Sequence, residues 1–227
     1  MRTLLYAPVI HTSVDLGSLA KQVTERGVAD LGGEAWQKHT EAVEHFWDKI
    51  SAYFDSLDVA GMKLYQDGMV AEGEVGQRIV EESAKAGSRN YELVSRLLQR
   101  GAFLVKTEDF KLVREERDRF VTFTQAKSGL PKVIAFLKYK FVQEELLNKR
   151  DKFIASRIEE SLAPDETGIL FVGAYHQVKK WLPESIRVRE IKEVRKVKEY
   201  QKLLPYGPKH QERLDILRSY LTSEVSL

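Results

Sequence analysis

Short apolar runs alternate along the chain with longer segments whose apolar residues recur at helical spacing. Five runs predict β-strands, over residues 3–10, 62–65, 102–105, 168–172 and 186–191. Helices are expected mainly over residues 34–57, 71–86, 90–99, 108–125, 131–162 and 194–204. Strands that alternate with helices are typical of parallel pairing. The pattern therefore predicts a helix-rich α/β fold, with a mostly parallel central sheet covered by long helices.

Two segments fall outside this alternation. Residues 11–33 are polar and contain glycines, and we expect a loop there. Near the other end, residues 205–208 (PYGP) precede a helical pattern over residues 211–221. We therefore expect a single α/β domain over residues 1–204 and a helical extension packed on it over residues 205–227. The extension carries an apolar stripe, which could pack within the chain or pair with a second copy in a homodimer; the stripe consists of Leu214, Leu217, Tyr220 and Leu221.

Composition excludes several classes of protein. The 227 residues are 43% hydrophobic, and 36 basic against 34 acidic side chains give a formal charge of +2. That balance argues against a nucleic-acid partner, and we expect the locally basic residues 187–202 to form a solvated face. The absence of cysteine excludes disulfides and thiolate chemistry. The sequence has neither a signal-peptide pattern nor a run of about 18 apolar residues, so we expect a cytoplasmic protein without a membrane partner.

Polar residues follow three of the expected strands. They are His11, Asp67 and His176, and if these strands are parallel neighbours, their carboxyl ends meet at one edge of the sheet. Two imidazoles and one carboxylate can hold zinc or manganese and leave a position for water. The alternative is that the two histidines are unrelated loop residues.

Gly173 and Arg150 are further candidates near the fourth strand. The strand stops at Gly173, which allows the backbone to turn sharply or to approach a ligand or cofactor closely. Arg150 lies on the preceding helix, where its guanidinium could hold a carboxylate or stabilise a developing oxyanion. An ion pair of Arg150 with Asp151, Glu144 or Glu145 would be the simpler alternative.

Residues 148–182 resemble the C-terminal signature of the TraB/Tiki superfamily, which includes ChaN-like and erythromycin-esterase-like proteins. The matching parts are Arg150-Asp151 at the start of a helical run, the strand over residues 168–172, and Gly173-Ala-Tyr-His176. The family also carries a first Gly-x-x-His after its opening strand, and here Pro8-Val-Ile-His11 keeps the histidine but not the glycine. The resemblance implies an α/β fold with two histidines, an acid and an arginine around one cleft.

The resulting expectation is a metal-dependent hydrolase-like protein acting on a peptide or small molecule. His11, Asp67 and His176 would bind the metal, with His176 and Arg150 as catalytic residues. Some members of the family resemble metal-dependent peptidases, whereas others bind haem. Two alternatives therefore stay open: a non-catalytic protein that binds an anion or haem at the strand ends, and an interaction module whose helices form a homodimer.

Overall fold

The five expected strands form one parallel sheet in the computed structural model, which describes residues 1–12, 14–15, 20–125 and 130–226. The strand order is β3-β2-β4-β1-β5, and every neighbouring pair is parallel. The strands are β1 (Arg2–Val9), β2 (Lys63–Gln66), β3 (Phe103–Val105), β4 (Thr167–Gly173) and β5 (Ile186–Glu190). The predicted α/β fold with a parallel sheet is confirmed.

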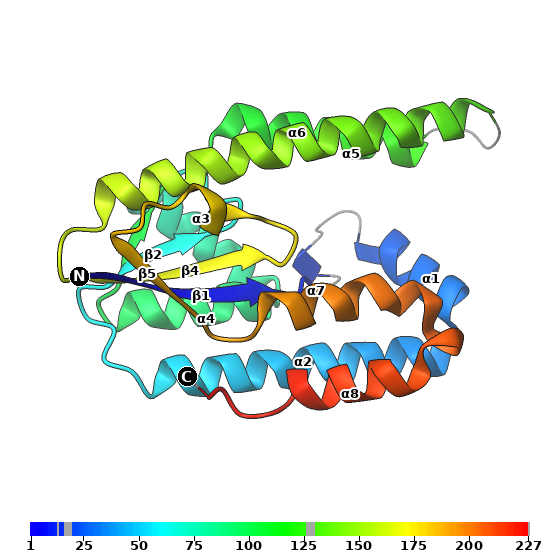
Figure 1. The fold of residues 1–227 in the computed structure, drawn as a ribbon, viewed down its shortest axis with the longest axis horizontal. Coiled ribbons are helices and arrows are strands. Elements are labelled where there is room, and N and C mark those ends of the chain that lie inside the picture. Colours follow the sequence, from blue (N-terminus) through cyan, green and yellow to red (C-terminus); the bar gives the residue numbers. More distant parts are fainter. Residues whose placement is uncertain (13, 16–19, 126–129, 227) are drawn as a thin grey trace.

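Long helices cover both faces of this sheet, as predicted. The helices are α1 (Ala20–Leu31), α2 (Gly33–Asp55), α3 (Gly73–Lys85), α4 (Arg89–Gln99), α5 (Phe110–Gln125), α6 (Leu130–Ser161), α7 (Val194–Leu203) and α8 (Gln211–Leu221), with the 3-10 turns η2 (Val178–Trp181) and η3 (Leu204–Lys209). Figure 1 shows α5 and α6 side by side along one side of the molecule, and α2 and α8 along the opposite side.

The loop expected over residues 11–33 is wrong for most of its length, because helix α1 occupies it. Gly27 lies in the middle of α1, and a Cβ atom placed there would lie 2.1 Å from an atom of the Trp36 ring. Glycine therefore allows α1 to pack closely against α2. Glycine also weakens a helical sequence pattern, which explains why the helix was missed.

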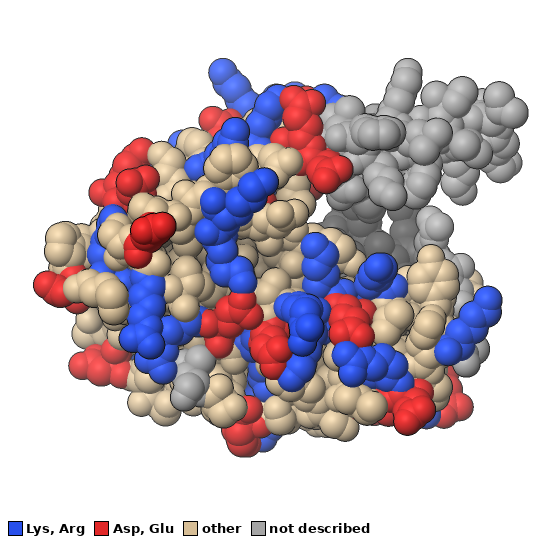
Figure 2. Space-filling model, viewed as in Figure 1, with Lys and Arg blue, Asp and Glu red and all other residues tan. Residues whose placement is uncertain are grey.

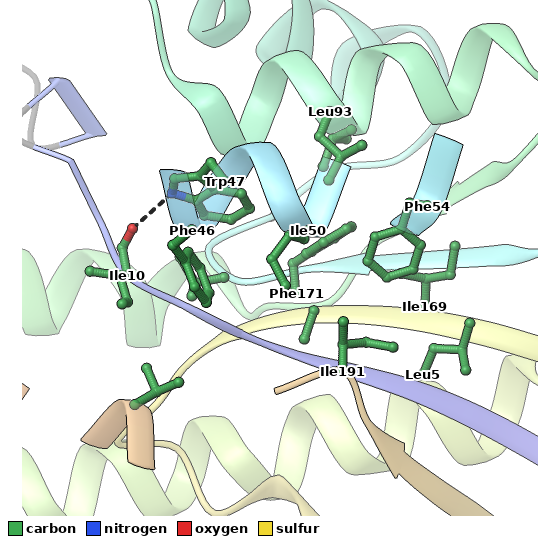
Figure 3. Close-up of a cluster of buried hydrophobic side chains, with 14 of the residues drawn as sticks. Leu5, Ile10, Phe46, Trp47, Ile50, Phe54, Leu93, Ile169, Phe171 and Ile191 are labelled. Carbon is green, nitrogen blue, oxygen red and sulfur yellow. Dashed lines mark hydrogen bonds between the residues drawn. The ribbon is translucent and has the colours of Figure 1, made fainter. Parts of the chain in front are cut away.

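The pleat of the strands divides the core into two layers. Leu5, Ala7 and Val9 of β1 face the larger cluster, which α2, α4 and α8 complete, whereas Leu4 and Tyr6 face the smaller cluster under α6 and η2. Figure 3 shows the aromatic centre of the larger layer.

One contact in the larger layer positions the end of β1. The indole Nε1 of Trp47 donates a hydrogen bond of 3.1 Å to the carbonyl of Ile10, and both residues are buried (Figure 3). Helix α2 therefore holds the chain immediately before His11.

The order of the strands places the switch point of the sheet, the position at which open α/β sheets form a ligand-binding crevice, between β2 and β4. After β2 the chain leads through α3 and α4 to β3 at one edge of the sheet, whereas after β4 it leads through η2 to β5 at the other edge. Connections that diverge from neighbouring parallel strands leave room at their carboxyl ends, where open α/β sheets bind ligands. The residues that follow β2 and β4 therefore occupy the position in which a functional site is expected.

The molecular surface carries both signs of charge. Basic and acidic side chains are interspersed over the face in Figure 2, in keeping with the balanced composition. Across residues 1–12, 14–15, 20–125 and 130–226, no helix is long and apolar enough to cross a bilayer.

The C-terminal extension is part of the core. Its helix α8 places Leu214, Leu217 and Leu221 in the larger hydrophobic cluster, and Tyr220 packs against the same cluster. The apolar stripe of this helix is thus covered within the chain.

This packing predicts a contrast between two neighbouring residues of α8. Leu217 is 1% exposed and Ile216 is 53% exposed. Leu217→Ala should lower the free energy of unfolding by about 2–5 kcal/mol, because it leaves a cavity in the core. Ile216→Ala should change it by less than ~0.5 kcal/mol. Urea denaturation followed by circular dichroism measures both values, and equal effects would contradict the described packing of α8.

Candidate functional site

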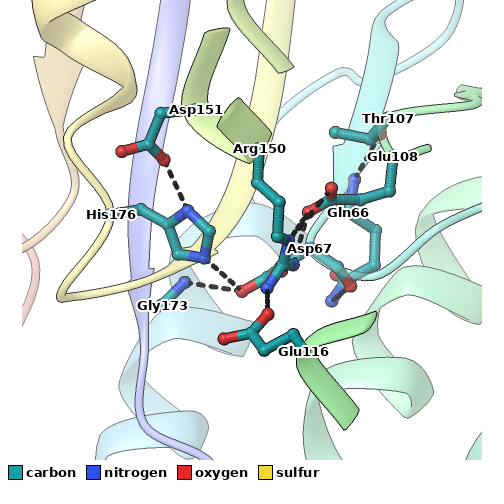
Figure 4. Close-up of polar contacts among 9 residues, drawn as sticks. All are labelled: Gln66, Asp67, Thr107, Glu108, Glu116, Arg150, Asp151, Gly173 and His176. Atoms are coloured by element: carbon teal, nitrogen blue, oxygen red, sulfur yellow. Dashed lines mark hydrogen bonds and ion pairs between the residues drawn. The ribbon is translucent and has the colours of Figure 1, made fainter. Parts of the chain in front are cut away.

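The strands that precede His11, Asp67 and His176 are neighbours, in the order β2-β4-β1. The backbone N–H of Asp67 continues the pairing of β2 with β4 by donating to the carbonyl of Phe171 at 2.8 Å. Figure 4 shows the Asp67 and His176 side chains facing each other, with 3.5 Å between Asp67 Oδ2 and His176 Nε2. The structure thus brings two of the three predicted metal ligands together at the carboxyl ends of β2 and β4.

His11 lies at the end of β1 and is less enclosed. Its side chain is 44% exposed, and its Nδ1 lies 3.8 Å from Asp15 Oδ2. It lines a cavity of about 580 Å³ together with Trp36 and His39. His11 is still close enough to Asp67 for its charge to contribute to lowering the pKa of that carboxyl.

Asp151 holds His176 in a fixed orientation. One carboxylate oxygen of Asp151 lies 2.6 Å from Nδ1 of His176, and the other accepts the backbone N–H of Gln177 at 2.8 Å. Because an ionised carboxylate only accepts hydrogen bonds, Nδ1 carries the ring proton in this contact. The Nε2 atom of His176 is therefore the one presented to Asp67.

Asp67 is fixed by two donors. Its Oδ1 accepts from Nη2 of Arg150 at 2.6 Å, and its Oδ2 accepts from the backbone N–H of Gly173 at 3.1 Å. A Cβ atom at Gly173 would lie 3.4 Å from Asp67 Oδ2 and 3.5 Å from the His176 ring. The backbone of Gly173 thus closely approaches two side chains of the protein itself. Its contact with a cofactor stays a prediction.

Carboxylates surround the guanidinium of Arg150. Its Nε donates to both oxygens of Glu108 at 3.1 Å, Nη2 donates to Asp67, and Nη1 donates to Glu116 (Figure 4). The side chain is buried. Its catalytic role stays a prediction, and its contacts in this structure are those of a residue that positions Asp67.

This network contains more carboxylates than cations. Asp67, Glu108, Glu116 and Asp151 face one arginine and one histidine. Burial raises the pKa of Glu108 to about 7 in spite of its hydrogen bonds to Arg150. The excess of negative charge therefore favours the uptake of a proton or another cation.

The protonation states of Asp67 and His176 result from opposing effects of burial and neighbouring charges. Burial alone would raise the pKa of Asp67, but His176, Arg150 and His11 together hold it well below its usual range. Burial alone would lower the pKa of His176, but the charge of Asp67 and the hydrogen bond to Asp151 raise it above 6.5. The pair therefore favours an ionised Asp67 and shifts His176 toward its protonated form in the absence of another cation.

Sequence reasoning missed three members of the network. Asp151 adjoins Arg150 in the sequence motif, so its position was a usable signal. Glu108 follows β3 by three residues, and the rule applied to the other strand ends would have found it. Glu116 lies inside α5, and no pattern distinguishes it from the other charged residues of that helix.

The fold and the site together define a parallel α/β protein with a buried carboxylate–histidine–arginine network at the divergence of β2 and β4. The chain matches no known protein family, no curated protein and no solved structure. Among the residues that the structure describes, no group of three or more His, Cys, Asp or Glu side chains is arranged to hold a metal ion. The predicted ligand set is thus represented by Asp67 and His176, with His11 farther out.

The raised pKa values predict a loss of stability from mildly acidic to alkaline pH. Glu108 and His176 both bind protons more tightly in the folded state, so their contribution is present at low pH and is lost as pH rises through the folded pKa, about 7 for Glu108. Asp67 acts in the opposite sense, and its contribution is lost as pH falls below its unfolded value of 3.8.

Glu108→Gln should therefore reduce the decline in the free energy of unfolding between about pH 5 and pH 7, by an amount on the order of 2 kcal/mol. Urea unfolding at several pH values measures the effect. Glu144→Gln, on the exposed surface of α6, is the matched control and should keep the wild-type profile. An unchanged profile in Glu108→Gln would contradict the assignment.

Proposed function

We propose that the protein is a metal-dependent hydrolase-like enzyme that acts on a peptide or small molecule in the crevice between β2 and β4. The observation that carries the proposal is the geometry of His176. Its Nδ1 is bound by the Asp151 carboxylate, and its Nε2 is directed at a second carboxylate, that of Asp67. The resemblance of residues 148–182 to the TraB/Tiki signature supports the same proposal.

The donor groups suit a divalent metal. Histidines that bind metals usually donate their other ring N–H to a carboxylate, which sets the tautomer and the orientation of the ring. Asp151 occupies that position toward His176. Nitrogen and carboxylate oxygen donors are common ligands of zinc, and both are compatible with manganese. His176 and Asp67 would hold the metal, and His11 would complete the set.

The charge of the network gives an independent reason for a cation. Four carboxylates share one arginine and one histidine, and Glu108 carries a pKa of about 7 because of burial. A divalent cation beside Asp67 would offset the excess negative charge and would favour the neutral form of His176.

Each residue of the network would have a distinct part in the reaction. A bound metal would supply Lewis acidity and lower the pKa of a water ligand. Asp151 accepts the Nδ1 proton of His176 and so presents Nε2, which a bound metal would occupy in place of a proton, while Arg150 and the N–H of Gly173 fix the Asp67 carboxylate. Arg150 thus acts by positioning, and the cavity beside His11 offers space for a substrate.

Metal content tests the proposal directly. Purified protein loaded with zinc or manganese should hold one metal ion per chain by elemental analysis, and His176→Ala should hold none. Asp151→Asn should retain the fold and bind metal about 10- to 100-fold more weakly, because only the support of His176 is lost. His45→Ala, on the exposed face of α2, is the matched control and should bind like the wild type. A protein that stays free of metal under all loading conditions would refute the proposal.

A non-catalytic binding protein is the second candidate, and the cavity beside His11 favours it. The cavity is lined by Trp36, His39 and Val43 as well as His11, and burial lowers the pKa of His39 to about 4, which keeps that ring neutral. The cavity also carries Glu44 and the Arg89–Asp48 ion pair, and the exposed imidazole of His11 would serve as the ligand for a bound haem.

Haem titration separates the two candidates. In the binding protein, haem should give a Soret band that is lost in His11→Ala and retained in His45→Ala. We expect no haem-specific band if the cavity serves only the hydrolase. A band of equal strength in His11→Ala would exclude ligation through this histidine.

A further inference from the structure

A second hollow of about 450 Å³ opens beside His176, on the surface formed by the loop after β4, η2 and the start of α7. Four basic side chains line it: Lys179, Lys180, Arg195 and Lys198. We call it the basic hollow. Figure 2 shows Lys and Arg side chains over α7 on this face, together with Asp and Glu side chains. Arg195 and Lys198 belong to the locally basic segment 187–202, and neither takes part in the buried network around Arg150.

The acidic residues of the basic hollow are already occupied. Glu190 forms an ion pair with Lys179, and its other carboxylate oxygen accepts the backbone N–H of Val194 at 2.8 Å. Glu193 pairs with Lys196 at 2.6 Å. Neither carboxylate is therefore free to neutralise the remaining cations.

The other three cations are not held in ion pairs by described residues, although the charge of Arg195 acts at longer range on Glu199. Within the described parts of the chain, no carboxylate lies within 4 Å of the charged groups of Lys180, Arg195 or Lys198. Lys180 lies 5.2 Å from the centre of the Trp181 ring, and Lys198 lies 5.1 Å from that of Tyr175. Aromatic neighbours restrain these side chains without cancelling their charge.

A buried hydroxyl lies between the basic hollow and the network. Tyr6 is completely buried, and its hydroxyl has no hydrogen-bond partner among the described residues. Lys179 lies 5.5 Å from the centre of its ring. Burial raises the pKa of Tyr6, and the charges of Asp151, Asp67 and Glu190 add to the effect. Asp151 and Asp67 belong to the network, and Glu190 lines the basic hollow. Tyr6 therefore lies between the network and the hollow.

We propose that the basic hollow binds the oxyanionic group, a phosphate or a carboxylate, of the substrate on which the site acts. The proposal rests on the proposed function and names its substrate class. Arg150 has its guanidinium bound by three carboxylates, so it has little capacity for a substrate anion. The unpaired cations lie instead beside His176, where an anionic group would place an adjoining bond next to the network.

Titration of the full chain with inorganic phosphate and, separately, with acetate tests the proposal. By calorimetry at low ionic strength, at least one of the two anions should bind the wild type. Arg195→Gln/Lys198→Gln should weaken that binding by at least about tenfold, since two charged contacts are lost. Tighter binding of phosphate would identify a phosphate-bearing substrate, and tighter binding of acetate a carboxylate-bearing one.

Lys202→Gln/Lys209→Gln is the matched control. It removes the same charge from exposed positions in α7 and η3 that do not line the hollow, and it should bind the anion as the wild type does. Binding of neither anion, or equal binding by the two double variants, would overturn the proposal.

The result of the anion titration does not depend on whether the protein binds a metal. Arg195 and Lys198 do not contact Asp67 or His176, so the metal content of Arg195→Gln/Lys198→Gln should equal that of the wild type. Anion binding through the basic hollow in a protein that takes up no metal would refute the hydrolase and keep the anion site. Metal binding without anion binding would refute the anion site and keep the hydrolase proposal.

Discussion

The burial of Arg150 among carboxylates is the interaction on which the site depends. Its guanidinium joins α6 to Asp67 after β2, to Glu108 after β3 and to Glu116 of α5. Removing one partner from such a buried cluster typically costs about 3–5 kcal/mol, because a charge is left without compensation. Asp67 in turn meets the Gly173 N–H and faces His176. One cation thus fixes the relative positions of α6, the residue after β2 and the segment from the end of β3 into α5.

The fold explains why this cluster lies where chemistry is possible. Because the chain leaves β2 and β4 in opposite directions, the carboxyl ends of these strands form the switch point of the sheet, where open α/β sheets bind ligands. The cavity beside His11 adjoins the end of β1, and the basic hollow adjoins the loop after β4. The two differ in charge, since residues of both signs line the first together with Trp36 and two histidines, whereas basic side chains predominate in the second.

The fold could be predicted from local patterns, whereas the site could be predicted only in part. Apolar runs located all five strands, and the polar residues after them gave Asp67 and His176. Helix α1 was missed because Gly27, required for contact with Trp36, weakens its pattern. Among the partners of Arg150, Glu108 could have been found as a polar residue after β3, whereas Glu116 could not, since it reaches Arg150 only after α5 and α6 have packed together. Contacts between distant segments leave no local signal.

The central claim is that the Asp67–His176 pair is a metal site supported by Asp151 and Arg150. Anomalous diffraction from crystals soaked in zinc tests it most directly, because the metal is located without reference to activity. The account predicts one strong peak about 2.0–2.2 Å from His176 Nε2 and from an Asp67 oxygen, with the His176–Asp151 contact kept. A crystal with no peak there, or with zinc only at exposed histidines such as His45 or His210, would contradict it.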